Sequence, residues 1–199
     1  DEPRAALIGR DVLSAGGTAA DAATAVYFAL SVTLPSSASL GGGGVCLVHD
    51  ATSARTEALR FLVRRPAAVP PGTARPTAVP GNPRGFFALH SKYGVLRWAQ
   101  LVAPAESLAR FGTPVSRALA HDLGQVGDAL LAEPGNRTLF GRRDGQGVLR
   151  EGDFMTQVGL AGQLSRLRSL GPGDFYVGRL ARTLVDAVAQ AGGSLSAGD

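Results

Sequence analysis

The side chains best suited to binding a charged ligand are arginines, and their densest group lies near the middle of the chain. Arg60, Arg64 and Arg65 fall within one short stretch, and Arg142 with Arg143 forms a second pair. A planar guanidinium can hold a carboxylate or phosphate through two parallel hydrogen bonds. The alternative is that these side chains are simply solvated, as surface arginines commonly are. Both interpretations stay open at this point.

The positive charge of the chain raises the question of a nucleic acid partner. The formal net charge is +4, and of the 20 basic residues only Lys92 is a lysine. No aromatic platform or known DNA- or RNA-binding pattern accompanies the scattered arginines. A GC-rich genome explains an arginine bias more simply, so we expect no nucleic acid partner.

The remaining chemically capable residues do not form a recognisable centre. His49, His90 and His121 are isolated from one another and from acidic or cysteine partners, so we expect neither a metal nor a cofactor. Cys46 lies in an apolar run and is expected to be a small buried residue. The glycines at 41–44 lack the pattern of a phosphate-binding loop, and we expect them to allow a close approach of backbone.

Two helices are predicted at the start of the chain. Residues 5–15 are weakly amphipathic and end at two glycines. Thr18 and Asp21 have the spacing of a capping box, so a second helix begins at Ala19 and must end before Pro35. Its buried side is rich in alanine, which predicts a closely packed partner, and we expect that residues 1–199 alone do not form the complete folded unit.

A β-hairpin is predicted next, from a strand at residues 45–48 and a second strand at 57–63. On an extended strand, Arg60, Leu62 and Arg64 point to the same side because side chains alternate. A guanidinium from either arginine can therefore reach a site beside Leu62.

The rest of the chain is predicted to be mostly helical. The proline-rich stretch from Pro66 to Arg84 has no period and indicates a surface loop. Apolar residues then recur at helical spacing in four segments, which start near Trp98, after Ser116, near Leu160 and near Leu180. The sequence therefore predicts an α+β fold with few strands.

The length of 199 residues and the 45% hydrophobic content fit a single domain. The longest apolar stretch, 22–34, is too short to span a membrane. The chain begins with Asp1, and a further helix-start box at Ser196 to Asp199 has no helix after it, so we expect part of a longer polypeptide. The compartment stays unknown, with the cytoplasm slightly favoured over a periplasmic or secreted location.

Six local strings, in order along the chain, resemble those of the γ-glutamyltransferase (γ-glutamyltranspeptidase) family. The residues at 16–23 resemble its "GGNAVDAA" helix start, and those at 35–44 its "P-x-SSG-(I/L)-GGGG" segment. The other four are similar to its "VPG…G", "YG…L-x-PA-x-x-LA", "GFPVS" and "AFY-x-G…GG" motifs, at 79–85, 93–108, 112–116 and 174–193. Each string alone is weak evidence, but the six occur in the family's order and together span nearly the whole chain.

This resemblance implies an N-terminal-nucleophile hydrolase, an αββα sandwich to which residues 1–199 contribute mostly helices and a few strands. In the family, a precursor cuts itself into a large and a small subunit, and the new N-terminal threonine of the small subunit is the nucleophile. Residues 1–199 are then a single-domain fragment of the large subunit and hold no catalytic residue. The implied partners are the small subunit of the same precursor, in a heterodimer or a dimer of heterodimers, and a small acyl or γ-glutamyl substrate.

The family's large subunit also supplies an arginine, in a "D-F-R-E-x-x-P" strand end, that binds the α-carboxylate of the glutamyl group. Aligned on Pro66, this chain has Leu62 in place of that arginine and Val63 in place of the glutamate. The resemblance thus assigns substrate binding to this strand end, where Arg60 or Arg64 would have to replace the missing guanidinium.

Three functions follow from these observations. The first is a γ-glutamyltransferase-like hydrolase or transferase. The second is a family member with an altered substrate, an acylase-like or biosynthetic enzyme that cleaves another amide or carbon–carbon bond, which the loss of the Arg-Glu pair favours. The third is a non-catalytic homologue.

Overall fold

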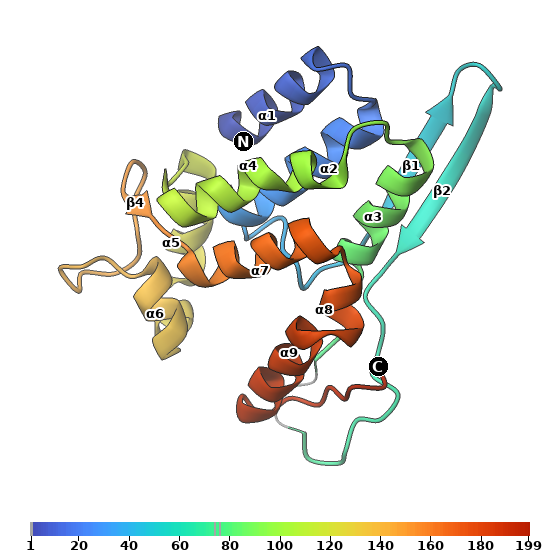
Figure 1. The fold of residues 1–199 in the computed structure, drawn as a ribbon. Coiled ribbons are helices and arrows are strands. Elements are labelled where there is room, and N and C mark those ends of the chain that lie inside the picture. Colours follow the sequence, from blue (N-terminus) through green and yellow to red (C-terminus); the bar gives the residue numbers. More distant parts are fainter. Residues whose placement is uncertain (1, 74, 76) are drawn as a thin grey trace. The chain divides into compact units, whose positions relative to one another are not determined.

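A computed structural model describes residues 2–73, 75 and 77–199, which divide into two compact units (Figure 1). The first unit comprises Asp1–Ser39 and Val95–Arg168, and the second comprises Leu40–Gly94 and Ser169–Asp199. Each unit is described by itself. The expectation that residues 1–199 form a single domain stays a prediction.

The first unit is built around helix α2 (Ala19–Thr33), which packs against α1 (Pro3–Ser14) and α4 (Trp98–Phe111) (Figure 1). The predicted capping box is present at its start, where Thr18 and Asp21 bond to each other's backbone N–H groups. The helices approach closely, since a Cβ atom on Gly9 would lie 2.7 Å from the Val26 side chain. The alanine-rich face of α2 is therefore covered by this chain's own helices. The closely packed partner that this face predicts is thus supplied within the first unit, and the expectation that residues 1–199 do not form the complete folded unit stays a prediction.

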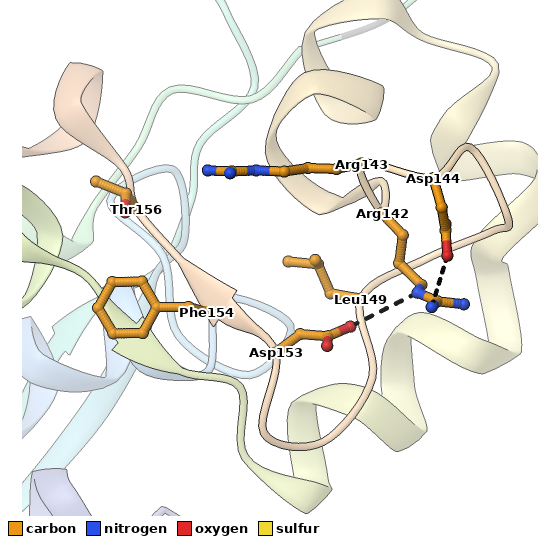
Figure 2. A pocket seen from close by; sticks show the side chains of 7 residues that line it. All are labelled: Arg142, Arg143, Asp144, Leu149, Asp153, Phe154 and Thr156. Atoms are coloured by element: carbon orange, nitrogen blue, oxygen red, sulfur yellow. Dashed lines mark ion pairs between the residues drawn. The ribbon is translucent and has the colours of Figure 1, made fainter.

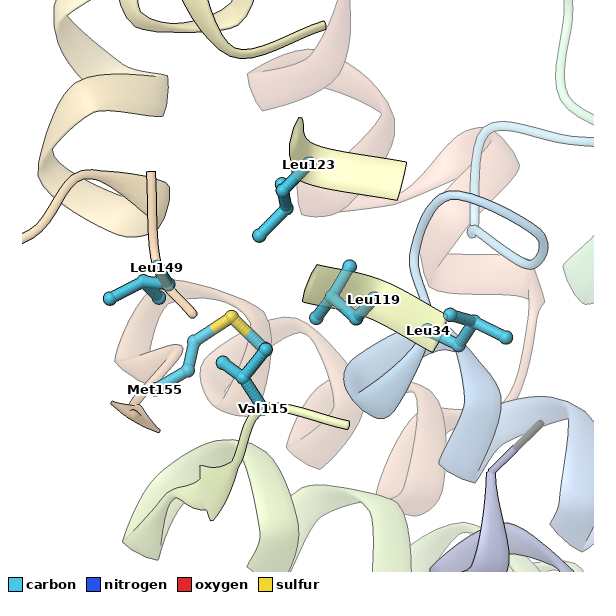
Figure 3. Packing of buried hydrophobic residues seen from close by; sticks show 6 residues of the cluster. All are labelled: Leu34, Val115, Leu119, Leu123, Leu149 and Met155. Atoms are coloured by element: carbon cyan, nitrogen blue, oxygen red, sulfur yellow. The ribbon is translucent and has the colours of Figure 1, made fainter. Parts of the chain in front are cut away.

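The rest of the first unit surrounds a small apolar core. Helix α4 contains Pro104 and has Gly112 as its C-cap, and Ser116 caps α5 (Arg117–Leu131) through the Leu119 N–H. Short strands β3 (Thr113–Pro114) and β4 (Phe154–Met155) pair antiparallel, and α6 (Pro134–Phe140) and α7 (Val158–Leu170) complete the unit. Figure 3 shows a buried apolar cluster of this unit, which consists of Leu34, Val115, Leu119, Leu123, Leu149 and Met155.

The second unit contains the predicted hairpin. Strands β1 (Gly44–Asp50) and β2 (Arg55–Phe61) pair antiparallel, with Gly44 opposite Phe61. Helices α3 (Asn82–Tyr93), α8 (Gly173–Val177) and α9 (Arg179–Gln190) complete the unit. The expected loop at 66–84 is too long by three residues, because α3 already begins at Asn82 with Pro83 in its first turn, where proline is favoured.

The hairpin is more exposed than its apolar sequence suggests. Val45 and Leu47 are 51% and 75% exposed, and Cys46 between them is half-buried. The expectation that Cys46 is a buried core residue is therefore wrong, although partial burial still raises the pKa of its thiol. In the described part of the chain, no helix is both long and apolar enough to cross a membrane.

Candidate functional site

A cavity of about 320 Å³ opens in the second unit where β2 ends beside the start of α3. Its walls combine three arginines with apolar side chains and glycines, and none of the described residues that line it is acidic. The lining residues are Leu59, Arg60, Phe61, Leu62, Arg64, Pro80, Gly81, Arg84, Gly85 and Ala88. A concave site with this charge favours an anionic ligand.

Glycines hold the end of β2 tightly against the start of α3. A Cβ atom on Gly81 would lie 2.0 Å from the Phe61 carbonyl oxygen, and one on Gly85 would lie 2.0 Å from the Phe61 ring. The carbonyl oxygen of Gly42 accepts hydrogen bonds from the N–H groups of Gly81 (2.8 Å) and Asn82 (2.9 Å). A larger side chain at either position would push the two cavity walls apart.

The expected role of the glycine run is confirmed at Gly43. A Cβ atom there would lie 2.4 Å from the backbone nitrogen of Val63. The chain segment before β1 therefore packs directly on the segment that follows β2. This contact fixes the backbone from Phe61 onward, which carries the arginines.

The structure brings Arg60, Leu62 and Arg64 to one cavity, but not on one strand. Strand β2 ends at Phe61, so only Arg60 lies within it, opposite Val45. Arg64 instead pairs its backbone with Val79, through hydrogen bonds of 3.2 and 2.8 Å. The expectation of a strand through Val63 is therefore wrong, because the chain leaves the hairpin to pack beside residues 79–81.

The side chain of Arg64 forms a hydrogen bond, whereas that of Leu62 is apolar and partly exposed. The Nη2 atom of Arg64 donates a long hydrogen bond (3.4 Å) to the main-chain oxygen of Asp199. Leu62 is 49% exposed and offers no donor. Leu62, which aligns with the family's arginine, is thus apolar and open to solvent.

Sequence reasoning missed a fourth cavity residue, Arg84. It lies one turn before Ala88 on α3, and both residues line the cavity. Its guanidinium carbon is 4.2 Å from the centre of the Tyr176 ring. The proline at position 83 was the available signal, since proline favours the first turn of a helix and would have placed Arg84 on α3.

Tyr176 of α8 is itself fixed by two hydrogen bonds. Its hydroxyl donates to the Pro80 carbonyl oxygen (3.1 Å) and accepts from the Arg84 N–H (3.3 Å). Burial raises the pKa of the phenol, so it stays neutral at physiological pH. The ring therefore presents a stable face to the Arg84 guanidinium.

A larger cavity, of about 440 Å³, lies in the first unit (Figure 2). Arg142 and Arg143, the second arginine pair of the sequence, both line this cavity but have different surroundings. Arg142 forms ion pairs with Asp144 (2.7 Å) and Asp153 (3.9 Å), whereas Figure 2 shows Arg143 extending across the open space toward Thr156. Two carboxylates thus offset much of the positive charge here, so the cavity in the second unit is the better anion site.

One of the three isolated histidines has a structural contact. The ring of His49 contacts the Thr56 hydroxyl across the hairpin (3.0 Å). Among the residues that the structure describes, no group of three or more histidine, cysteine or acidic side chains is placed to hold a metal ion.

Comparison with known proteins decides the family. The profile described as gamma-glutamyltranspeptidase matches residues 5–199. The chain belongs to the gamma-glutamyltranspeptidase family. The resemblance that the six motifs indicated is thereby confirmed.

Two relatives illustrate how much of a family member this chain represents. The glutathione hydrolase proenzyme of Bacillus subtilis (strain 168) is 34% identical over 214 residues, which cover 99% of this chain and 36% of that protein. The proenzyme of Escherichia coli (strain K12) is 33% identical, with 98% and 36% covered. The chain thus spans about a third of the length of these gamma-glutamyltranspeptidase relatives.

Solved structures of the gamma-glutamyltranspeptidase family share the fold. The gamma-glutamyltranspeptidase of Helicobacter pylori has a TM-score of 0.92 at 30% identity, covering 100% of this chain and 61% of that one. The cephalosporin acylase of Bacillus halodurans has a TM-score of 0.84 at 29% identity, covering 97% and 39%. These matches confirm the expected fold class, an α+β part of an N-terminal-nucleophile hydrolase that is mostly helical with few strands.

Proposed function

We propose that this chain is the first part of the large subunit of a self-processing enzyme that hydrolyses or transfers γ-glutamyl groups. The supporting observation is the cavity with three arginines at the end of β2, where the family places its carboxylate-binding arginine. Family membership supports the reaction type, and the names of the curated relatives, glutathione hydrolases, favour a γ-glutamyl substrate over the altered-substrate alternative.

In the proposed reaction, this chain binds the substrate and the small subunit of the same precursor performs the bond exchange. The α-amine of the small subunit's N-terminal threonine takes the proton of its own hydroxyl, whose oxygen attacks the γ-carbonyl carbon. The amide C–N bond then breaks, the leaving amine takes up the proton, and a glutamyl ester remains. Water or a second amine attacks this ester and restores the threonine hydroxyl.

Binding of the α-carboxylate is the step assigned to Arg60, Leu62 and Arg64. The two arginines supply charged donors at the rim of the cavity, and Leu62 supplies an apolar wall. A charge-assisted hydrogen bond at such a site contributes about 1.5–3 kcal/mol. Holding the carboxylate at this end of the glutamyl chain would leave its γ-carbonyl free for attack.

The altered-substrate alternative has one observation in its favour. Leu62 and Val63 are 49% and 44% exposed, so the strand end presents apolar surface where the family's Arg-Glu pair would be polar. A structural relative that is named a cephalosporin acylase is consistent with it. In that case neither Arg60 nor Arg64 would contribute to substrate selection.

The test uses the full-length precursor and compares wild type with Arg60→Ala, Arg64→Ala and Leu62→Arg. Intact mass should show two chains, the second beginning with threonine, and light scattering should show whether the heterodimer pairs further. We expect a fall of about ten- to a hundred-fold in kcat/KM on a γ-glutamyl anilide for at least one alanine variant. Arg65→Ala, which lies outside the cavity lining, is the matched control. Unchanged kinetics in both alanine variants would show that neither Arg60 nor Arg64 binds the carboxylate, and no cleavage of the γ-glutamyl anilide by wild type would favour the alternative.

A further inference from the structure

Arg84 is better placed than Arg60 or Arg64 to present a guanidinium to the cavity in the second unit. It shares one face of α3 with Ala88, four residues later, and both line the cavity. Arg60 also lines the cavity, from β2, where it lies opposite Val45, but no described aromatic ring holds its guanidinium as Tyr176 holds that of Arg84. Arg64 already donates to the oxygen of Asp199.

The Tyr176 ring holds the Arg84 guanidinium by its flat face. The 4.2 Å separation between the guanidinium carbon and the ring centre is that of a cation–π contact. Such a contact restrains the guanidinium beside the ring, and a guanidinium can make a planar, two-point contact with a carboxylate. No described carboxylate forms an ion pair with Arg84.

Arg84 has no evident role in stabilising its own helix. It lies in the first turn of α3, where a positive charge opposes the helix dipole. Its side chain is exposed rather than buried in the packing of the unit.

We propose that Arg84 is the main carboxylate-binding residue of this chain and that it determines specificity for the α-carboxylate of a γ-glutamyl substrate. The Arg84 guanidinium, on α3, would take the role of the family's arginine, which Leu62 replaces on the other side of the same cavity. This inference rests on the proposed function above, and it names the residue that carries its substrate selection.

The test compares two substrates that differ by one group. The full-length, processed protein is assayed on a γ-glutamyl anilide and on the 4-aminobutyryl anilide, which keeps the amine but lacks the α-carboxylate. Arg84→Ala should lower kcat/KM on the γ-glutamyl anilide by about ten- to a hundred-fold, mainly through KM, and change the other substrate by less than about three-fold. Arg84→Lys should lower kcat/KM on the γ-glutamyl anilide by an intermediate factor, because lysine keeps the charge but lacks the paired N–H donors of a guanidinium.

A binding measurement and a control separate the possible failures. The inhibition constant of L-glutamate should rise in Arg84→Ala by the same factor as KM, whereas Arg65→Ala should change neither quantity. If wild type cleaves the γ-glutamyl anilide and Arg84→Ala affects both substrates equally, or leaves L-glutamate inhibition unchanged, this inference is overturned and the proposed function stands. If wild type does not cleave the γ-glutamyl anilide, the proposed function itself fails.

Discussion

The buried carboxylate of Asp21 accepts a 2.9 Å hydrogen bond from the backbone N–H of Val95, 74 positions away in the sequence. The same oxygen also accepts from the N–H groups of Thr18 (3.0 Å) and Leu96 (3.3 Å). One side chain thus caps α2 and ties the segment that precedes α4 to it. Asp21 belongs to the first of the six family-like strings, so a structural role accounts for its place in that motif.

Replacing Asp21 with alanine should therefore destabilise the first unit strongly. Three backbone N–H groups would lose their acceptor, and buried donors without partners are costly, so we expect a loss of about 3 kcal/mol or more in the free energy of unfolding. Urea denaturation of the processed protein measures it. Asp11→Ala is the control, since the Asp11 side chain is 64% exposed and should change stability by no more than about 0.5 kcal/mol. Equal effects of the two substitutions would refute this account of Asp21.

Truncating the core of the first unit should have a comparable effect through a different cause. Leu119 of α5 is 1% exposed and lies in the cluster of Figure 3. Leu119→Ala leaves a cavity and should cost about 2–5 kcal/mol. Val126→Ala, on the same helix at a position 52% exposed, should cost far less. Thermal unfolding of both variants compares them, and a larger shift for Val126→Ala would mean that α5 is oriented differently.

The attachment of the hairpin to α3 should depend on pH. The side chains of Lys92 and Tyr93 both donate hydrogen bonds to the Glu57 carboxylate and lower its pKa, with Lys92 having the larger effect. The same hydrogen bond to Glu57 raises the pKa of Lys92. A carboxyl with a lowered pKa stabilises the fold above about pH 4.3, and this contribution disappears as the pH falls through the lowered value. The raised pKa of Lys92 acts in the opposite sense, so its contribution is present below about pH 10.4 and disappears as the pH rises through the raised value.

Glu57→Gln is the matched test of this pair. Amide hydrogen exchange in β2 should be faster in the variant than in wild type near neutral pH, and the difference should shrink in acid below the lowered pKa of Glu57. Because the pair is exposed, added salt should also reduce the difference. A difference that persists unchanged in acid would show that the ion pair does not hold the hairpin on α3.

Tyr176 offers a way to separate ring stacking from hydrogen bonding at the cavity. Tyr176→Phe removes the hydrogen bond to Pro80 but keeps the ring under Arg84, whereas Tyr176→Leu removes both. If the ring orients the guanidinium, the inhibition constant of L-glutamate should rise by several-fold more in the leucine variant. Equal effects of the two substitutions would assign the role to the hydroxyl instead.

Local signals predicted the elements whose ends are fixed by nearby residues. The capping box at Thr18 and Asp21 and the helix start after Ser116 both lie where the structure uses them. The apolar positions of α5, including Leu119 and Leu123, are also the ones that enter the core. These features depend on residues within a turn or two of one another, which a sequence shows directly.

The cavity in the second unit depended on contacts that a sequence does not show. Helix α3 was missed because its packing side is built from Pro83, Gly85 and Leu89 rather than from a stripe of large apolar residues. The early end of β2 follows from the fit of Phe61 against Gly81 and Gly85, which are distant in sequence. Arg60, Leu62 and Arg64 do line one cavity, their role in substrate binding stays a prediction, and Arg84 could join them only once α3 was known.

The most direct test of the account is the substrate preference of the processed, full-length wild-type protein. Its kcat/KM on a γ-glutamyl anilide is compared with that on an anilide of a plain acyl group of similar length, which has neither the α-carboxylate nor the α-amine. A site that binds the carboxylate through arginines predicts a preference of at least about a hundred-fold for the γ-glutamyl compound. Equal or faster cleavage of the plain acyl anilide would contradict a γ-glutamyl function and favour the altered-substrate alternative.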